Sequence, residues 1–480
     1  MTRPHVRLLT RDHPGLNPYL HGLDIPRGAP VYWYPDGRLI RFTGSGSAQR
    51  IPVRTSSLLE WVVQHEPEQL WNRWRTHLRD QRVLVEHTSI NPVHPLHVGS
   101  MRGTVIGSTL AELFRSGGAD VQTRYFVNDL GRQLHILQRA LTAARQDNIP
   151  TELRFDDTIG VLYAYANMAL AARTADMGRL ISAHPWLPTV VDVHRPLPEA
   201  MSASDVVEAM VAAAVSDMGL LGAKIDIFDR ETDLSIDPAT LVAALTDHCD
   251  VVRINGTTCL RLPSGLVPVQ RRDGTLLYLS RDIANTHRRQ PSAWSAILHV
   301  IGAEQTLLQT ALRTAVPDAP LEHIAVGKVS HAGRHYSARQ NRLTTMGDLL
   351  RDGGPRRIHE LALAMALRRR THPIDIAHLD TAKPLQTVLT ATHAVHRAGQ
   401  FPNQRLLRHL IIAILATPAI LARDVDHRTI HRTAQHLTRL SQRYTIAVRS
   451  GTVPDDISEW FHHTQTRLAT LLGITLDTLS

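Results

Sequence analysis

The chain has very little lysine. Its 480 residues include only Lys224, Lys328 and Lys383, although Lys and Arg together number 53 against 44 Asp and Glu. The net charge of +9 is therefore carried almost entirely by arginine, whose planar guanidinium suits bidentate contacts with phosphates. A basic balance is expected of a nucleic-acid-binding protein, but a GC-rich coding sequence would produce the same composition. The charge alone does not decide between the two.

Cysteine and long apolar runs are also scarce. The two cysteines, Cys249 and Cys259, are not in a CxxC spacing, which argues against a disulfide framework or a cysteine zinc site. No apolar run reaches the roughly 20 residues of a membrane span, and residues 1–15 have no apolar segment typical of a secretory signal. His462 and His463 fit a polar helix face, so no metal site is expected. We predict a cytoplasmic protein without membrane contacts.

The two ends of the chain have their own patterns. Residues 31–44 predict a β-hairpin around Asp36-Gly37, and residues 58–80 predict one or two amphipathic helices. Residues 355–480 are helical by periodicity, with apolar stripes typical of an α-helical bundle. These segments predict separate structural regions on either side of a central domain.

The central part begins with a strand–turn–helix–strand pattern. Residues 83–89 form a β-branched apolar run, residues 105–118 an apolar helix ended by two glycines, and residues 120–129 a second strand. Such a βαβ unit implies a parallel sheet, in which ligands bind at the carboxyl ends of the strands. Functional residues are therefore expected in the turn at 90–100.

The rest of the central part alternates in character. Residues 135–235 are mostly helical by pattern, whereas residues 295–312 predict a strand followed by a helix. Strand-and-turn structure is predicted for three further segments, 223–234, 251–263 and 267–284.

Several short motifs occur in order along the chain, and the last of them lies in the helical region. The segments are VEHTSINPVHPLHVGSMRGTVIGS (85–108), YFVNDLGRQ (125–133), GTLLYLSRDIAN (274–285), HVIGAEQTL (299–307), HYSARQNRLTTMGDLL (335–350) and PLQTVLTATHAVHRAG (384–399). In this order they resemble the motifs of class I arginyl-tRNA synthetases, and His97-Val98-Gly99-Ser100 in the first segment is the counterpart of the family's HIGH motif. The resemblance covers about residues 80–480.

The resemblance implies an α/β fold: a Rossmann-like class I catalytic domain, a C-terminal α-helical bundle of anticodon-binding type and a small N-terminal α+β region. We expect the catalytic domain at 81–350, with an insertion at about 135–235, and the helical domain at 355–480. Residues 1–80 do not resemble the family's N-terminal domain, and their role is left open. The resemblance also suggests a monomer and a divergent, truncated paralogue.

The arginine pocket of the family is matched position by position. Glu86 and Asp282 correspond to the carboxylates that hold the guanidinium group, which needs an acidic, bidentate partner. Asn91, Tyr278 and Gln305 correspond to residues that orient the rest of the amino acid. The alternatives are a surface salt bridge for Glu86 and a core position for Tyr278.

The ATP motifs depart from the family. Gly99 permits close approach of a nucleotide and the following helix can direct its N-terminus at phosphates, but Ser100 replaces the second histidine of HIGH. The KMSKS-type loop reads His335-Tyr336-Ser337-Ala338-Arg339-Gln340 and has no lysine. We assign catalysis to His97, Gly99, Ser100, Ser337 and Arg339. We assign ATP binding to His94, His97, Gly99, His335 and Arg339.

Two functions remain open. The first is ATP- and Mg²⁺-dependent activation of arginine, with transfer to tRNA or, in a specialised paralogue, to a peptide or small amine. The second is a non-catalytic protein that binds tRNA or arginine as a sensor or accessory factor. The complete arginine pocket favours the first, and the altered ATP motifs favour the second. An ordinary housekeeping synthetase is ranked below a divergent paralogue, and Lys328 is either a further phosphate ligand or a solvated loop residue.

Overall fold

The computed structural model describes residues 7–10, 30–33, 39–42, 48–51, 55–143, 153–187, 203–336, 343–394 and 403–479. The chain divides into two compact units. One comprises residues 81–111 and 120–380, and the other comprises residues 1–80, 112–119 and 381–480.

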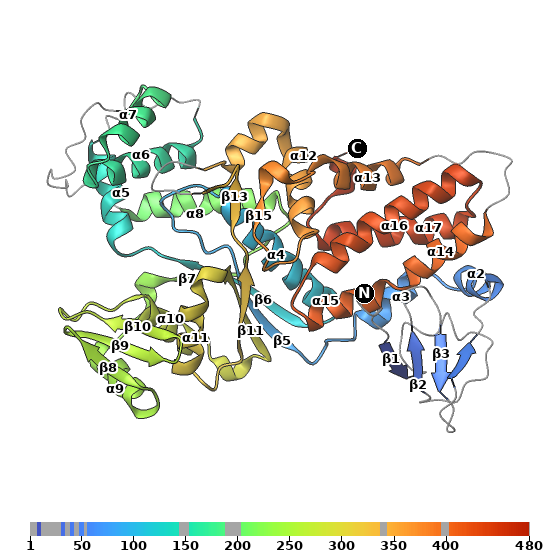
Figure 1. The fold of residues 1–480 in the computed structure, drawn as a ribbon, viewed down its shortest axis with the longest axis horizontal. Helices are drawn as coiled ribbons and strands as arrows, with labels where there is room; N and C mark the ends of the chain where they lie inside the picture. Colours follow the sequence, from blue (N-terminus) through green and yellow to red (C-terminus); the bar gives the residue numbers. More distant parts are fainter. Residues whose placement is uncertain are drawn as a thin grey trace. The chain divides into compact units, whose positions relative to one another are not determined.

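The first unit is built on a five-stranded parallel sheet of order β12-β11-β5-β6-β7 (Figure 1). The middle of β5 is fully buried, as its β-branched apolar run predicts. The chain runs from β5 to β6 on one side and later returns to β11 on the other side, so the strand order reverses between β5 and β11. The strands are β5 (Arg82–Glu86), β6 (Asp120–Val127), β7 (Ile227–Arg230), β11 (Ala296–Gly302) and β12 (Leu321–Val326).

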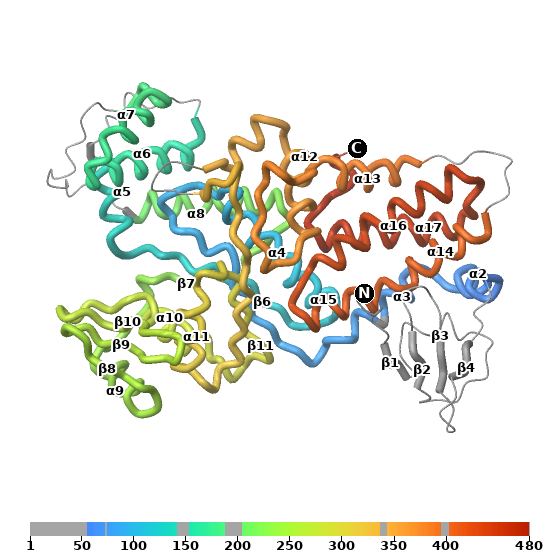
Figure 2. The backbone as a smooth tube through the Cα atoms, in the orientation of Figure 1, coloured from blue at the N-terminus to red at the C-terminus, as the bar shows by residue number. Residues whose placement is uncertain are grey.

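Helices connect the parallel strands, as the predicted βαβ unit requires. Helix α4 (Val98–Ser116) joins β5 to β6, and α11 (Thr306–Ala315) joins β11 to β12. Figure 2 follows the chain from β6 through a helical insertion to β7, which confirms the helical character predicted for 135–235. The insertion contains α5 (Arg132–Ala143), α6 (Phe155–Leu170), α7 (Thr174–Ala183) and α8 (Ala203–Gly219).

A small antiparallel sheet of order β10-β9-β8 follows β7. The prediction of strand-and-turn structure for 267–284 is wrong in its second half, because residues from Tyr278 onward form helix α10. Leu279 and Ile283 lie four residues apart on one helix face and pack with Val267 and Leu312 in one buried cluster. The elements are α9 (Pro238–His248), β8 (Val251–Ile254), β9 (Thr257–Leu262), β10 (Gly265–Gln270) and α10 (Tyr278–Arg288).

The first unit ends with short strands around one long helix. Helix α12 begins with a capping box, in which the Thr345 hydroxyl and the Asp348 carboxylate each accept a hydrogen bond from the other residue's backbone N–H. It is kinked at Gly353 and Gly354, just before Pro355. The elements are β13 (Val329–His331), β14 (Arg334–His335), α12 (Met346–Ala366) and β15 (Ile374–Asp375).

The second unit contains an antiparallel sheet and a bundle of helices. Strands β2 and β3 pair in the register Tyr32↔Ile40, which confirms the predicted hairpin, although its Asp36-Gly37 turn lies outside the described residues. The helices of the predicted bundle pack around α16. The elements are β1 (Arg7–Thr10), β2 (Pro30–Trp33), β3 (Leu39–Phe42), β4 (Ala48–Ile51), α2 (Thr55–Val63), α3 (Pro67–Trp74), α13 (Ala382–Thr392), α14 (Gln404–Leu415), α15 (Thr417–Asp426), α16 (His431–Ser450) and α17 (Asp455–Leu471).

A test of helix length and apolarity addresses membrane insertion. Within the described parts of the chain, no single helix is long and apolar enough to cross a membrane. The pair α14 and α15 reaches that length and composition only when taken together, and it is bent by 42°.

Candidate active site

At the reversal of strand order, a carboxylate and an imidazole side chain lie on neighbouring strands. Glu86 is the last residue of β5, and its Cα partner in β11 is His299. In open α/β sheets, ligands bind at the carboxyl ends of the strands where the order reverses. The candidate site is therefore sought at this edge of the sheet.

A cavity of about 440 Å³ lies at this point and contains all five residues predicted to bind arginine. Glu86 comes from β5, Asn91 from the following turn, Tyr278 and Asp282 from α10, and Gln305 from the turn before α11. Tyr278 is 63% exposed, so the core alternative does not hold for it. Residues more than two hundred positions apart in sequence thus line one space.

Glu86 is already paired within the protein. Its carboxylate lies 2.6 Å from the Arg289 guanidinium, which also lies 2.6 Å from Asp229. Burial acts to raise the pKa of Glu86, but Arg289 and His299 outweigh it and hold the pKa below its usual value. Glu86 is therefore ionised and is not a surface salt bridge, because Arg289 is buried.

Asp282 is in a different state. No hydrogen bond or ion pair to its carboxyl group occurs among the described residues. Burial, with repulsion from Glu86, raises the pKa of Asp282 to about 7. A carboxyl group with such a pKa, facing a cavity, is available to a cationic ligand.

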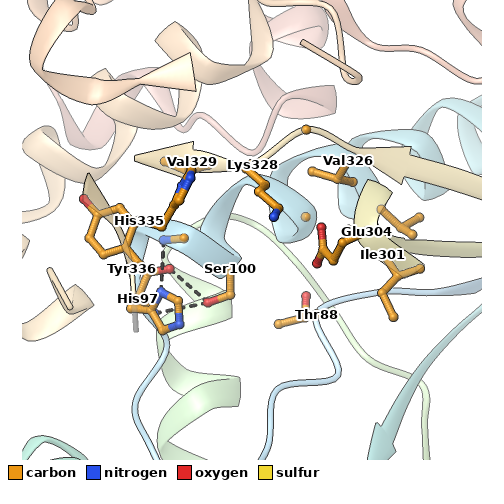
Figure 3. Close-up of a pocket in the computed structure, with 15 residues that line it drawn as sticks. Thr88, His97, Ser100, Ile301, Glu304, Val326, Lys328, Val329, His335 and Tyr336 are labelled. Carbon is orange, nitrogen blue, oxygen red and sulfur yellow. Dashed lines mark hydrogen bonds between the residues drawn. The ribbon is translucent and has the colours of Figure 1, made fainter. Parts of the chain in front are cut away.

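A second cavity, of about 410 Å³, lies at the N-terminus of α4 (Figure 3). His97, Gly99 and Ser100 line it, together with His335 from β14. Thr88, Val300 and Ile301 line both this cavity and the arginine cavity, so the two spaces share a wall. The two cavities are therefore adjacent.

Thr88, at this shared wall, has an unusual backbone. Its φ is 71°, which a β-branched residue rarely adopts. The hydroxyl contacts His87 Nδ1 at 2.7 Å and donates to the Thr104 hydroxyl at 3.0 Å, so two neighbours hold the conformation. Strain of this kind is concentrated at functional sites.

His97 and Ser100 form the beginning of α4. The backbone N–H of Gly99 donates to His97 Nδ1 at 3.0 Å, so the ring proton is on Nε2. Burial, with repulsion from His94, lowers the pKa of His97 to about 3, so the ring is neutral at physiological pH. The Ser100 hydroxyl accepts from the His97 N–H at 3.3 Å and donates to the His97 carbonyl at 2.9 Å. Ser100 thus acts as a helix cap.

Three residues predicted for catalysis or ATP binding have other outcomes. His94 is not among the residues that line the cavity, and its ring lies 5.3 Å from that of His97. Burial lowers the pKa of His94, so its ring is neutral at physiological pH. Ser337 and Arg339 lie outside the described residues.

Other lining residues were not selected from the sequence. In the arginine cavity these include Arg289 and His299, and in the second cavity they include Glu304 and Tyr336. His299 and Glu304 lie within the motif at 299–307, so the sequence could have identified them as site residues. Arg289 had no such signal, because its function as a partner of Glu86 depends on the tertiary fold.

A third cavity, of about 610 Å³, adjoins the first at Tyr278. Arg132, Arg173 and Arg271 line it, and no ion pair to these arginines occurs among the described residues. The cavity therefore offers positive charge to an anionic group next to Tyr278, where it adjoins the arginine cavity.

Comparisons with known proteins identify the family. Residues 68–365 match the family described as tRNA synthetases class I (R), catalytic domain. Arginine–tRNA ligase of Ignicoccus hospitalis is 28% identical over 66% of this chain and 60% of its own length. That of Aeropyrum pernix is 24% identical over 82% of this chain and 79% of its own length.

Solved structures extend the likeness of fold to most of the chain. Arginyl-tRNA synthetase of Thermus thermophilus has a TM-score of 0.66 and 19% identity, over 89% of this chain and 86% of that one. A structure from Campylobacter jejuni described as a putative arginyl tRNA synthetase has a TM-score of 0.64 and 19% identity, over 88% of this chain and 98% of that one.

The fold is that of the class I synthetases: a parallel catalytic sheet followed by a helical C-terminal region, as predicted. Because the family match covers more than half of the chain, the protein belongs to the arginyl-tRNA synthetase catalytic-domain family. The alignment with the Ignicoccus relative nevertheless spans less than two thirds of that relative.

Proposed function

We propose that this protein activates arginine with ATP and transfers the arginyl group to tRNA. The observation that carries the proposal is the convergence of the five predicted arginine-binding residues in one cavity, which shares a wall with the cavity at the α4 N-terminus. An amino-acid activating enzyme needs two adjacent substrate sites of this kind.

The arginine side chain is held at the inner end of its cavity. Asp282 supplies the free carboxylate for the guanidinium group, while Glu86 adds negative charge that it shares with Arg289. Asn91 accepts a hydrogen bond from Asn128 through its carbonyl at 2.9 Å, which leaves its amide group to donate. Tyr278 and Gln305 flank the rest of the ligand.

Activation is a substitution at the α-phosphorus of ATP. A carboxylate oxygen of arginine forms the new bond, the bond to the β-phosphate breaks, and pyrophosphate leaves as arginyl-adenylate forms. His97 Nε2–H and the backbone at the α4 N-terminus stabilise the phosphate charge. A ribose hydroxyl of tRNA then attacks the arginyl carbonyl and releases AMP.

Magnesium fits this site only as a companion of the nucleotide. No group of three or more His, Cys, Asp or Glu in the described parts of the chain could hold a metal ion. Mg²⁺ in such enzymes uses one or two carboxylates, water and substrate phosphates. Glu304 is the carboxylate that lines the cavity. When bound with ATP, Mg²⁺ would neutralise part of the phosphate charge.

Two clusters of arginine favour tRNA over a peptide or a small amine as the acceptor. Arg132, Arg173 and Arg271 surround the cavity that adjoins Tyr278, where the phosphates of an acceptor end would enter. In the helical unit, burial lowers the pKa of His409, and nearby arginines lower it further. These arginines, which belong to α14 and α16, are Arg443, Arg405 and Arg408.

The altered ATP motifs support the further proposal of a divergent paralogue. Ser100 is used as a helix cap, and the segment 335–340 contains no lysine. The same observations favour a second candidate, a protein that binds arginine or tRNA without catalysis. An arginine cavity alone would serve either function, so the enzyme is favoured by the arginine cavity together with the adjacent cavity at the α4 N-terminus.

Charging of tRNA with radiolabelled arginine tests the proposal. We expect arginine to become attached to total tRNA in an ATP-dependent reaction, through a base-labile ester. The Asp282→Asn protein should lose this activity and serves as the background control. Binding of arginine without any charging, under conditions in which tRNA also binds, would favour the non-catalytic candidate.

A further inference from the structure

Lys328 is the cationic residue of the nucleotide cavity that the function described above does not use. It lines the 410 Å³ space with His97, Gly99 and Ser100. Among the described residues that line this cavity, His97 and His335 are the other side chains able to carry positive charge, and His97 is neutral at physiological pH. Lys328 is thus the candidate among these lining residues for contact with a phosphate group.

The backbone around Lys328 is fixed from two sides. Gly327 donates its N–H to the Arg370 carbonyl at 2.7 Å, and the Lys328 carbonyl accepts from the Ile374 N–H at 2.9 Å. A Cβ on Gly327 would lie 2.5 Å from the His372 carbonyl oxygen, so the chain passes this point in close contact with its neighbour. The loop between β12 and β13 therefore has little freedom.

Arg102 connects this loop to the helix whose N-terminus forms the cavity. Its side chain extends from α4, is 0% exposed, and donates to the carbonyls of Gly327 at 2.9 Å and His372 at 2.6 Å. The Arg369 carbonyl accepts a further bond at 2.9 Å. Helix α4 and the segment bearing Lys328 are thereby held at a fixed separation, as preorganised charge requires.

The Lys328 side chain points into the space between the α4 N-terminus and Glu304 (Figure 3). No ion pair to its ammonium group occurs among the described residues. Lys328 is exposed, and Glu304 lines the same cavity. The ammonium group is therefore available to an anion that enters the cavity.

We propose that Lys328 binds the β- and γ-phosphates of ATP and stabilises the pyrophosphate that leaves. This inference rests on the proposed activation of arginine, which it deepens by naming the residue that replaces the absent loop lysines. Lys328 forms an ion pair with the phosphate oxygens that gain charge when the bond between the α- and β-phosphates breaks.

The scarcity of lysine permits a direct labelling test. The protein is treated with formaldehyde and a mild reductant, with and without ATP and Mg²⁺, and methylation of each lysine is measured by mass spectrometry. Lys224, an exposed residue of the same unit, is the internal control. We expect ATP to protect Lys328 at least about fivefold and to leave Lys224 unchanged. Equal protection of both, or of neither, would overturn the inference.

Substitution provides the second arm. We expect Lys328→Met to weaken ATP and pyrophosphate binding, measured by calorimetry, by about tenfold to a hundredfold, the usual effect of a charged hydrogen bond. Lys328→Arg should recover part of the affinity, and Lys224→Met should bind as the parent protein does. Unchanged affinity in Lys328→Met contradicts the inference, whatever its activity.

The two arms separate this inference from the proposed function. Protection of Lys328 by ATP in a protein that shows no arginine-dependent reaction supports the phosphate site and contradicts the enzyme. Arginine activation that survives Lys328→Met at the full rate supports the enzyme and contradicts the phosphate site.

Discussion

At the scale of the single residue, Glu86 and Asp282 show how two carboxyl groups in one cavity differ. Glu86 is ionised because Arg289 lies 2.6 Å away. Asp282 is partly buried and has no such partner among the described residues, and its pKa is raised to about 7. A guanidinium ligand must therefore displace a proton from Asp282 when it binds below this pH.

Arginine affinity is consequently expected to depend on pH. A bound cation favours the ionised form and lowers the pKa of Asp282, so affinity should rise with pH up to about 7 and become constant above it. In Asp282→Asn the rise should disappear, and affinity should fall by about a hundredfold or more, because breaking a buried pair costs about 3–5 kcal/mol. Calorimetry between pH 5.5 and 8.5 measures both, and a flat profile in the parent protein would contradict the assignment.

Replacement of Gly99 by a residue with a side chain is expected to destabilise the protein for a steric reason. A Cβ at this position would lie 2.7 Å from His97 Cε1 and 3.2 Å from Tyr336 Cβ. We expect Gly99→Ala to lower the free energy of unfolding by about 1–3 kcal/mol, as overpacking does.

Gly103, in the same helix, is the matched control for Gly99. A Cβ there meets nothing within 4 Å, so Gly103→Ala should be neutral or more stable by up to about 1 kcal/mol. Denaturant unfolding of both variants measures the difference. Equal stability of the two would show that the contact with His97 has no energetic effect.

At the scale of the element, α15 and α16 are joined by one buried carboxylate. Asp424 is 0% exposed and accepts hydrogen bonds from the Thr433 N–H at 2.7 Å and the Thr433 hydroxyl at 2.8 Å. Arg432 donates a further bond at 3.2 Å. Asp424 satisfies a free N–H in the first turn of α16 and links it to the preceding helix.

Removal of this carboxylate should destabilise the helical unit. We expect Asp424→Ala to lower the free energy of unfolding by at least about 3 kcal/mol, since charged hydrogen bonds contribute about 1.5–3 kcal/mol each. Glu459→Ala, at an exposed position of α17, should change it by less than about 0.5 kcal/mol. A similar small effect in both variants, measured by thermal unfolding, would mean that Asp424 does not join the helices.

The elements also show which parts of the structure were predictable. The β5–α4–β6 unit followed from local patterns, because a buried strand and a helix ended by glycines have distinct signals. Helix α10 was assigned incorrectly because its helical face, Leu279 and Ile283, is set by packing against distant residues. The five arginine-cavity residues came from the family resemblance, whereas the pairing of Glu86 with Arg289 needed the tertiary structure.

At the scale of the whole molecule, the net charge of +9 and the arginine-lined cavity predict salt-dependent tRNA binding. Each phosphate contact contributes roughly 0.7 to the slope of log affinity against log salt for single strands. Replacement of Arg132, Arg173 and Arg271 by alanine should therefore reduce the slope by about 2.

Filter binding of tRNA across salt concentrations measures this slope. Arg253→Ala, at an exposed position of β8 away from the cavity, is the control and should leave it almost unchanged. An unaltered slope in the triple variant would contradict binding of the tRNA acceptor end in this cavity. A peptide or a small amine would then be the acceptor to test.

Arginine-dependent exchange between ATP and labelled pyrophosphate is the most direct test of the central claim, that this chain forms an adenylate with arginine. It should be run with and without total tRNA, with lysine and citrulline as control amino acids. The account predicts exchange with arginine, little with lysine, and none with citrulline, whose uncharged group cannot pair with Asp282. An absence of exchange in both conditions, while arginine still binds, would contradict it and leave a binding protein on a synthetase fold.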